Sequence, residues 1–275
     1  MRDVLRSSAA QLAAAGCISS DREAELAIRR LTAADGRDPD GILSAAELLA
    51  VDDYIERRRN GDPPHYILGG CEFMGRWIRL DETAYIPRPW TETLVLRGVA
   101  TLKRARRPRI AVDLGTGSGA IARILAERVN DCHVWALEVD EAALRWARMN
   151  TAEAKNVTVL ESDLFDALPA PLAGRVDLVI GSLPYVPSGE LAALPRDYRE
   201  HEPMTALDGG RDCLGVDLRA LRDALAWLRP GGRVLLELGH RQGNPLVGEA
   251  LQLGYRDARA QLDDEGDDLF LEGRR

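Results

Sequence analysis

The sequence predicts an α/β protein with a helical segment in front of it, and three observations carry this prediction. Arg109–Val112 is a short apolar run typical of a buried strand; a glycine-rich turn follows it, and Ala120–Arg128 has the pattern of a helix. Further apolar runs alternate with helical segments later in the chain, as in a parallel sheet. Residues 1–68 are instead rich in Ala, Leu, Glu and Arg, without a β-branched run.

Length and composition narrow the class of protein. The chain has 275 residues, enough for one large domain or a main domain with a small one. A net charge of −8 argues against a broad duplex-binding surface. The four cysteines lie far apart without a C-x-x-C pair, so we expect neither disulfides nor a metal site. No run reaches ~18 apolar residues, and no signal-peptide pattern opens the chain, so we expect a cytoplasmic protein without a membrane span.

The first 68 residues predict a small helical bundle. A helix-start signal lies at residues 19–23, and a further helix is expected over 44–59, ended by Asn60–Pro64. Turns are predicted at 35–36 and 38–41. Two apolar runs around a glycine in residues 71–80 predict a β-hairpin that links the bundle to the main domain.

The glycine-rich turn joins the first strand of the main domain to its helix. Asp113 ends the strand, and glycines follow at 115, 117 and 119, with Thr116 and Ser118 between them. Glycines let the backbone approach a ligand closely, and the helix start points free N–H groups at it. A purely structural turn is the alternative. The pattern Asp-x-Gly-x-Gly-x-Gly resembles the first motif of class I methyltransferases that use S-adenosylmethionine, which implies that these residues bind that cofactor.

An acid follows the second predicted strand, His133–Leu137. Glu138 lies about 20 residues beyond the glycine turn, a spacing that suits hydrogen bonds to ribose hydroxyls. Asp140 is the competing residue, although it fits better as the N-cap of the helix that follows. We therefore favour Glu138 as the ribose ligand.

Two further strands are predicted at 157–160 and 176–180, each followed by polar residues. Ligands of open α/β sheets bind at the carboxyl ends of the strands, which places Ser182, Leu183, Pro184 and Tyr185 near the site. The rest of the chain predicts a helix over 216–228, a turn at 229–232, a strand over 233–238, a helix over 242–253 and a final hairpin. The acidic turn of that hairpin, residues 263–268, lacks the ligand spacing of a calcium loop.

Several motifs together resemble the glutamine methyltransferases that modify peptide chain release factors. They are Arg57-Arg58, Pro64-x-Tyr66-Ile67-Leu68-Gly69, Pro87-Arg88-Pro89-x-Thr91-Glu92 and the glycine turn. The resemblance implies a Rossmann-like class I methyltransferase sheet with a small N-terminal helical bundle and a linking β-hairpin. The expected domains are 1–68, 69–90 and 91–275. It also implies S-adenosylmethionine as cofactor and a release factor as protein partner.

The resemblance assigns roles to further residues. It places the Ser-Asp stretch after the third strand along the adenine, where Asp163 would accept from the amino group and Leu164 would pack on the ring. Arg88 and Pro89 would form one wall of the cofactor site. A plain loop acid at Asp163 and a rigid linker at Arg88-Pro89 are the alternatives.

The chain departs from the family pattern at the expected catalytic loop. The family has Asn-Pro-Pro-Tyr where this chain has Ser-Leu-Pro-Tyr at 182–185, and an acid where this chain has Trp90. In the family, the Asn oxygen and a backbone carbonyl accept from the substrate amide. Here Ser182 can still accept one hydrogen bond, the carbonyl of Leu183 is kept, and Tyr185 can stack on a planar acceptor.

These departures keep other functions open. A small-molecule amine, amide or hydroxyl is the main alternative acceptor, and a cofactor-binding protein without catalysis is another. Methylation of a nucleic-acid base is disfavoured by the acidic net charge. His201 is interpreted as structural rather than as a general base, and residues 192–211 as a mobile lid.

Overall fold

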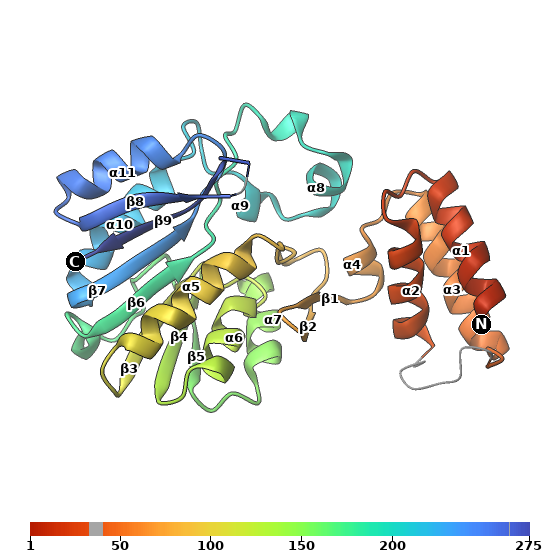
Figure 1. Cartoon of the computed structure of the whole chain (residues 1–275), viewed down its shortest axis with the longest axis horizontal. Coiled ribbons are helices and arrows are strands. Elements are labelled where there is room, and N and C mark those ends of the chain that lie inside the picture. Colours follow the sequence, from red (N-terminus) through yellow and green to blue (C-terminus); the bar gives the residue numbers. More distant parts are fainter. Residues whose placement is uncertain (33–40, 264) are drawn as a thin grey trace.

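The computed structural model describes residues 1–32, 41–263 and 265–275. It contains an N-terminal group of helices that stands beside a larger sheet domain (Figure 1). The turn predicted at 35–36 and residues 38–40 of the turn predicted at 38–41 lie outside the described residues.

The N-terminal helices form a bundle with its own core. They are α1 (Arg2–Ala14), α2 (Ser20–Leu31), α3 (Ala45–Arg59) and the short α4 (Pro64–Ile67). Ser44 caps α3 through a reciprocal capping box with Glu47, as the predicted start at residue 44 requires. Inside the bundle, Glu23 accepts hydrogen bonds from Tyr54 and Arg58 at 2.8 and 2.7 Å.

A β-hairpin connects the bundle to the sheet domain, as predicted. Strands β1 (Gly70–Phe73) and β2 (Arg76–Arg79) pair antiparallel. The guanidinium of Arg30 in α2 lies 3.7 Å from the centroid of the Trp77 ring in β2. The hairpin therefore touches the bundle through a cation–π contact as well as through the chain.

The main domain is built on a seven-stranded sheet in the order β5-β4-β3-β6-β7-β9-β8. The first five of these run parallel, whereas β9 pairs antiparallel with both β7 and β8. Their bounds are β3 Arg109–Leu114, β4 Cys132–Glu138, β5 Val157–Glu161, β6 Val176–Gly181, β7 Leu228–Glu237, β8 Arg256–Leu262 and β9 Asp268–Arg274. The turn predicted at 229–232 is wrong, because β7 already begins at Leu228, with a register irregularity where it passes Pro230–Gly232.

Helices cover both faces of the sheet. Successive residues of each strand alternate between two cores: Ala111 and Leu178 belong to one, Val112 and Val179 to the other. Helices α5 (Thr91–Arg104), α6 (Ala120–Arg128) and α7 (Glu141–Thr151) supply the first core; α10 (Gly215–Trp227) and α11 (Gly243–Gln252) supply the second. The fold is the doubly wound α/β class that the sequence predicts.

The strand order reverses between β3 and β6. The chain runs from β3 outward to β4 and β5, then returns to place β6 on the other side of β3. The loops that follow β3 and β6 consequently diverge to opposite sides of the sheet. This divergence opens a crevice at the carboxyl ends of the two strands, which is where open α/β sheets bind ligands.

Asp217 of α10 is an acid with nothing to pair with in its surroundings. Its side chain is buried, and neither carboxylate oxygen has a hydrogen-bond partner. Burial raises the pKa of Asp217 to about 8. The folded protein therefore holds a proton there that an unfolded chain releases above about pH 4.

We expect Asp217→Asn to make the protein more stable at high pH. Between about pH 4 and pH 8 the folded state binds more protons at this site than the unfolded state, so wild-type stability falls as pH rises. The variant lacks this loss, so its free energy of unfolding in urea should match the wild type near pH 3 and exceed it near pH 9. Asp223→Asn, exposed on the same helix, is the control. Equal pH slopes for Asp217→Asn and wild type would contradict the expectation.

Candidate active site

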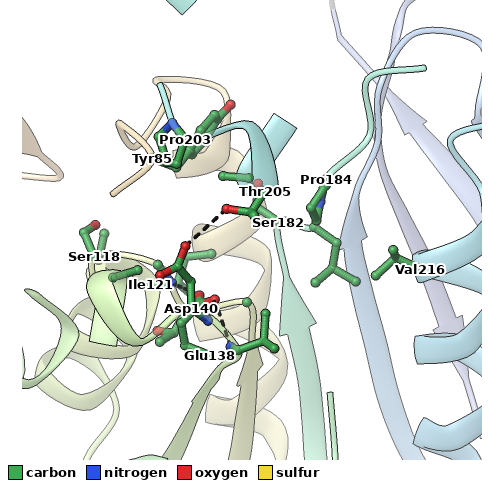
Figure 2. A pocket seen from close by; sticks show the side chains of 18 of the residues that line it. Tyr85, Ser118, Ile121, Glu138, Asp140, Ser182, Pro184, Pro203, Thr205 and Val216 are labelled. Carbon is green, nitrogen blue, oxygen red and sulfur yellow. Dashed lines mark hydrogen bonds between the residues drawn. The ribbon is translucent and has the colours of Figure 1, made fainter. Parts of the chain in front are cut away.

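A cavity of about 260 Å³ lies at the carboxyl ends of β3, β4 and β6 (Figure 2). The sequence-predicted residues that line it are Gly115, Thr116, Gly117, Ser118, Glu138, Asp163, Leu164, Ser182, Leu183, Pro184 and Tyr185. Asp113, Gly119, Arg88 and Pro89 were also expected at this site but do not line the cavity.

The glycine turn has a backbone that side chains would disturb. Gly115, Gly117 and Gly119 all have positive φ, at 60°, 53° and 80°. A Cβ on Gly119 would lie 2.9 Å from the Cα of Ala147 in α7, and one on Gly115 would lie 3.0 Å from Leu183 Cδ2. The turn thus packs directly on its neighbours and leaves room for a ligand beside its backbone.

Asp113 stabilises this turn through hydrogen bonds to its buried carboxylate. Its fully buried carboxylate accepts from the Thr116 hydroxyl at 2.5 Å and from the Ala122 backbone N–H at 3.0 Å, both through Oδ2. Burial raises the pKa of Asp113 to about 7, against the opposing effect of these two hydrogen bonds. The side chain therefore fixes the loop and the start of α6, rather than facing the cavity.

Glu138 lies at the cavity wall, at the end of β4. Its Oε2 accepts from the Gly117 N–H at 2.8 Å, while Oε1 accepts from the backbone N–H groups of Val139 and Asp140. Burial raises the pKa of Glu138. Asp140 caps α7 by accepting from the Ala142 N–H at 2.8 Å, so the predicted N-cap is confirmed.

The loop after β5 brings two more expected residues to the wall. Ser162 orders this loop, because its hydroxyl donates to the Leu164 carbonyl and accepts from the Ala167 N–H. Leu164 is largely buried, with a φ of 47°. Asp163 is half-exposed and accepts from Arg219 of α10 at 2.8 Å, an ion pair that spans this side of the cavity.

The predicted catalytic loop follows β6 on the opposite wall. Ser182 Oγ donates to Glu237 Oε1 at 3.0 Å. Leu183 is buried against the glycine turn. The Tyr185 hydroxyl lies 3.2 Å from that of Tyr85.

Glu237 lies behind this wall, in contact with Ser182, and is not predicted from the sequence. It ends β7, which is the neighbour of β6, and only 1% of its surface is exposed. Its Oε1 also accepts from the Trp90 indole N–H at 3.2 Å, and burial raises its pKa. The argument that singled out Glu138, an acid at the carboxyl end of a strand, applies equally to Glu237 and would have found it.

Arg88 does not form the cofactor wall expected from the sequence, because its side chain contacts other protein residues instead. Its buried guanidinium forms an ion pair with Glu202 and donates to the Tyr85 hydroxyl at 3.1 Å. It also lies over the rings of Tyr85 and Tyr198. The Pro87–Pro89 segment is thereby tied to the region that follows the catalytic loop.

That region closes the cavity from a third side. It contains η2 (Leu191–Ala193), α8 (Arg196–His201) and α9 (Met204–Leu207), and Pro203, Thr205, Ala206 and Asp208 line the cavity. Thr205 Oγ1 donates to Asp140 Oδ2 at 3.2 Å across the opening (Figure 2). His201 is not in the lining, and movement of residues 192–211 stays a prediction.

The acidic turn between β8 and β9 contains one group of side chains with metal-ligand spacing. Oxygens of the exposed residues Asp263, Glu265 and Asp267 lie within 4.8 Å of one another, and no other such group occurs in residues 1–32, 41–263 and 265–275. The Asp263 carboxylate accepts from the backbone N–H groups of Glu265 and Asp267, which already orders the turn. None of the described helices has the length and apolar character needed to span a membrane.

Comparison with known proteins gives matches over the whole chain. Residues 111–201 match the family model of a methyltransferase domain, and residues 3–69 match that of the PrmC N-terminal domain. A release factor glutamine methyltransferase of Deinococcus radiodurans is 34% identical over 100% of this chain and 98% of its own length. One from Moorella thermoacetica is 38% identical over 80% of this chain and 78% of its own.

Solved structures agree on the fold. A methyltransferase from Pyrococcus furiosus superposes with a TM-score of 0.53 at 23% identity, covering 74% of this chain and 90% of that one. The hMettl16 catalytic domain, solved with a MAT2A 3′UTR hairpin, gives a TM-score of 0.58 at 17% identity, covering 86% of this chain and 84% of its own. At these identities the likeness concerns the fold alone.

We expect Gly119→Ala to destabilise the protein by about 2 kcal/mol or more, because a left-handed backbone costs a side chain ~1–2 kcal/mol and the new Cβ would press on Ala147. Gly248→Ala is the control: this glycine lies in α11 with nothing near its Cβ position, and Ala there should stabilise by about 0.5–1 kcal/mol. Urea unfolding measures both. Equal stability of the two variants would show that the turn is not held as described.

Proposed function

The chain belongs to the release factor glutamine methyltransferase family, and on this premise we propose that it transfers a methyl group from S-adenosylmethionine to the side-chain amide nitrogen of a glutamine in a peptide chain release factor. One observation carries the proposal: the Ser182–Tyr185 loop and the glycine turn line the same cavity from opposite sides. A cofactor held on the turn would therefore meet an acceptor held on the loop.

The cofactor side fits a nucleoside with a charged tail. The positive-φ glycines leave a backbone cradle that side chains would fill, and Glu138 offers carboxylate oxygens at the cavity wall for ribose hydroxyls. Leu164 offers an apolar surface for the base. When bound, S-adenosylmethionine supplies a methyl group on a positively charged sulfur.

The acceptor side must orient a poor nucleophile, because the amide nitrogen lone pair is delocalised. Ser182 Oγ and the Leu183 carbonyl are acceptors for the two amide hydrogens, and the Tyr185 ring lines the same wall. Such contacts would hold the nitrogen at a near-attack distance of roughly 3–3.5 Å from the methyl carbon. The Arg88–Glu202 pair and the Tyr85–Tyr185 contact fix the loop that does this.

A second candidate is the same transfer to a small-molecule amine, amide or hydroxyl. The observation that favours it is the pair of side chains at the cavity wall, because Ser182 and Leu183 stand where the family has Asn and Pro. Methylation assays with the two kinds of acceptor separate the candidates.

Incubation of the purified protein with labelled S-adenosylmethionine and a release factor tests the proposal. We expect one methyl group per release factor, located by mass spectrometry on the glutamine of the Gly-Gly-Gln loop and lost when that glutamine is replaced by Ala. Cofactor binding without incorporation would reject the release factor as substrate and favour the small-molecule acceptor.

We expect Glu138→Ala to weaken S-adenosylmethionine binding at least about tenfold, since hydrogen bonds to a charged group contribute about 1.5–3 kcal/mol. Asp140→Ala should change the affinity less than about threefold. One Asp140 oxygen already accepts from the Ala142 N–H at the start of α7, and the other accepts from the Thr205 hydroxyl. Titration calorimetry measures both affinities. The reverse order would make Asp140 the ribose ligand.

A further inference from the structure

Two positions at which this chain departs from the family pattern meet at one atom. The Ser182 hydroxyl and the Trp90 indole N–H both donate to Oε1 of Glu237, at 3.0 and 3.2 Å. Ser182 and Trp90 are far apart in the chain, and β7 brings Glu237 between them. Both side chains therefore donate to a single buried carboxylate.

The contact with Glu237 settles the direction of the hydrogen bonds that Ser182 can make. A hydroxyl has one proton and two lone pairs, so an isolated serine can act as donor or acceptor. When Glu237 is ionised, the Ser182 proton points to Oε1, because an ionised carboxylate only accepts. The lone pairs of Oγ remain for a group in the cavity that Ser182 lines. Ser182 is thereby held as an acceptor, the property that an amide substrate requires.

We propose that Glu237 is a positioning residue that holds Ser182 as a hydrogen-bond acceptor and receives, through the Ser182 hydroxyl, the proton that the substrate nitrogen loses on methylation. This inference rests on the proposed function and adds a proton path to it. The inference also predicts how the Glu237 carboxyl group titrates when no methyl acceptor is bound.

The step balances in atoms and charge. The amide nitrogen lone pair forms the new N–C bond, and the electrons of the broken S–C bond stay on sulfur. The N–H proton passes to Ser182 Oγ while the Ser182 proton passes to Glu237 Oε1. The products are a neutral thioether, a neutral N-methyl amide and a protonated Glu237, which then returns its proton to solvent.

The surroundings of Glu237 suit a group that gains and loses a proton. Burial raises its pKa, whereas the nearby Thr91 hydroxyl, the hydrogen bonds from Ser182 and Trp90 and the charge of Arg88 lower it. Tyr85 and Tyr185 are the other titratable groups whose protonation depends on its charge. Its Oε2 is buried without a hydrogen-bond partner.

A serine offers something that an asparagine at the same position does not. The Asn oxygen can accept from the substrate while its N–H donates to Glu237, so it can orient the amide. It cannot take up one proton and pass on another without changing tautomer. Ser182→Asn should therefore keep the orientation and remove the proton path.

Single-turnover methylation of the release factor tests the proton path. We expect Glu237→Gln to lower the rate about 100-fold or more, which is the low end of acid–base contributions. Glutamine keeps the size of the side chain and an acceptor for Ser182, so S-adenosylmethionine affinity should stay within about twofold. The wild-type rate should rise with pH as Glu237 ionises, and this rise should be absent in Glu237→Gln. Asp217→Asn is the matched control, because it replaces another buried carboxyl group by an amide outside the cavity lining and should leave the pH profile unchanged.

The same substitution in a Ser182→Asn background separates positioning from structure. Here Glu237→Gln should cost less than about threefold, since the proton path is already absent. An equal loss in both backgrounds, or a near-wild-type rate for Glu237→Gln alone, overturns the proposal.

A measurement without substrate keeps the two proposals apart. The side-chain carboxyl resonance of Glu237, assigned in ¹³C-glutamate-labelled protein by comparison with Glu237→Gln, gives its titration curve. Ser182→Ala should move the midpoint upward by about one pH unit, because the carboxylate loses a donor. If the release factor is not methylated but this shift occurs, the Ser182–Glu237 unit stands and only the acceptor is wrong. An unchanged midpoint rejects the unit whatever the acceptor.

Discussion

The carboxylate of Asp113 fixes the geometry on which the cavity depends. It joins the end of β3 to the glycine turn through Thr116 and to the start of α6 through one backbone amide. The turn held in this way lies against Leu183 of the catalytic loop and donates a backbone N–H to Glu138. The proposed cofactor wall and the proposed acceptor wall therefore both depend on the Asp113 carboxylate, which would align a transfer between two bound molecules.

The acceptor wall is braced by contacts between distant parts of the chain. Arg88, from the segment before α5, pairs with Glu202 beyond α8 and donates to Tyr85. Tyr85 in turn meets Tyr185 of the catalytic loop. The linker after the hairpin thus shapes the site, and its residues Thr83, Tyr85 and Pro87 line the cavity.

Local patterns in the sequence predict much of this structure. The strands, the positive-φ glycines and the acid at the end of β4 follow from short-range rules, and their order predicts the crevice at the strand ends. Glu237 could not be connected to Ser182 in this way, because the two are 55 residues apart and only the pairing of β6 with β7 brings them together. Arg88 is a second case. Its short motif indicates a functional residue, but the motif does not predict that the guanidinium pairs with Glu202 and Tyr85.

A crystal structure with S-adenosylhomocysteine and a release-factor fragment carrying its Gly-Gly-Gln loop tests the central claim most directly. The shared cavity predicts the glutamine amide nitrogen at about 3 Å from both Ser182 Oγ and the Leu183 carbonyl oxygen, with Ser182 still donating to Glu237. A glutamine side chain bound outside the cavity, or one whose amide nitrogen does not contact Ser182, would contradict it.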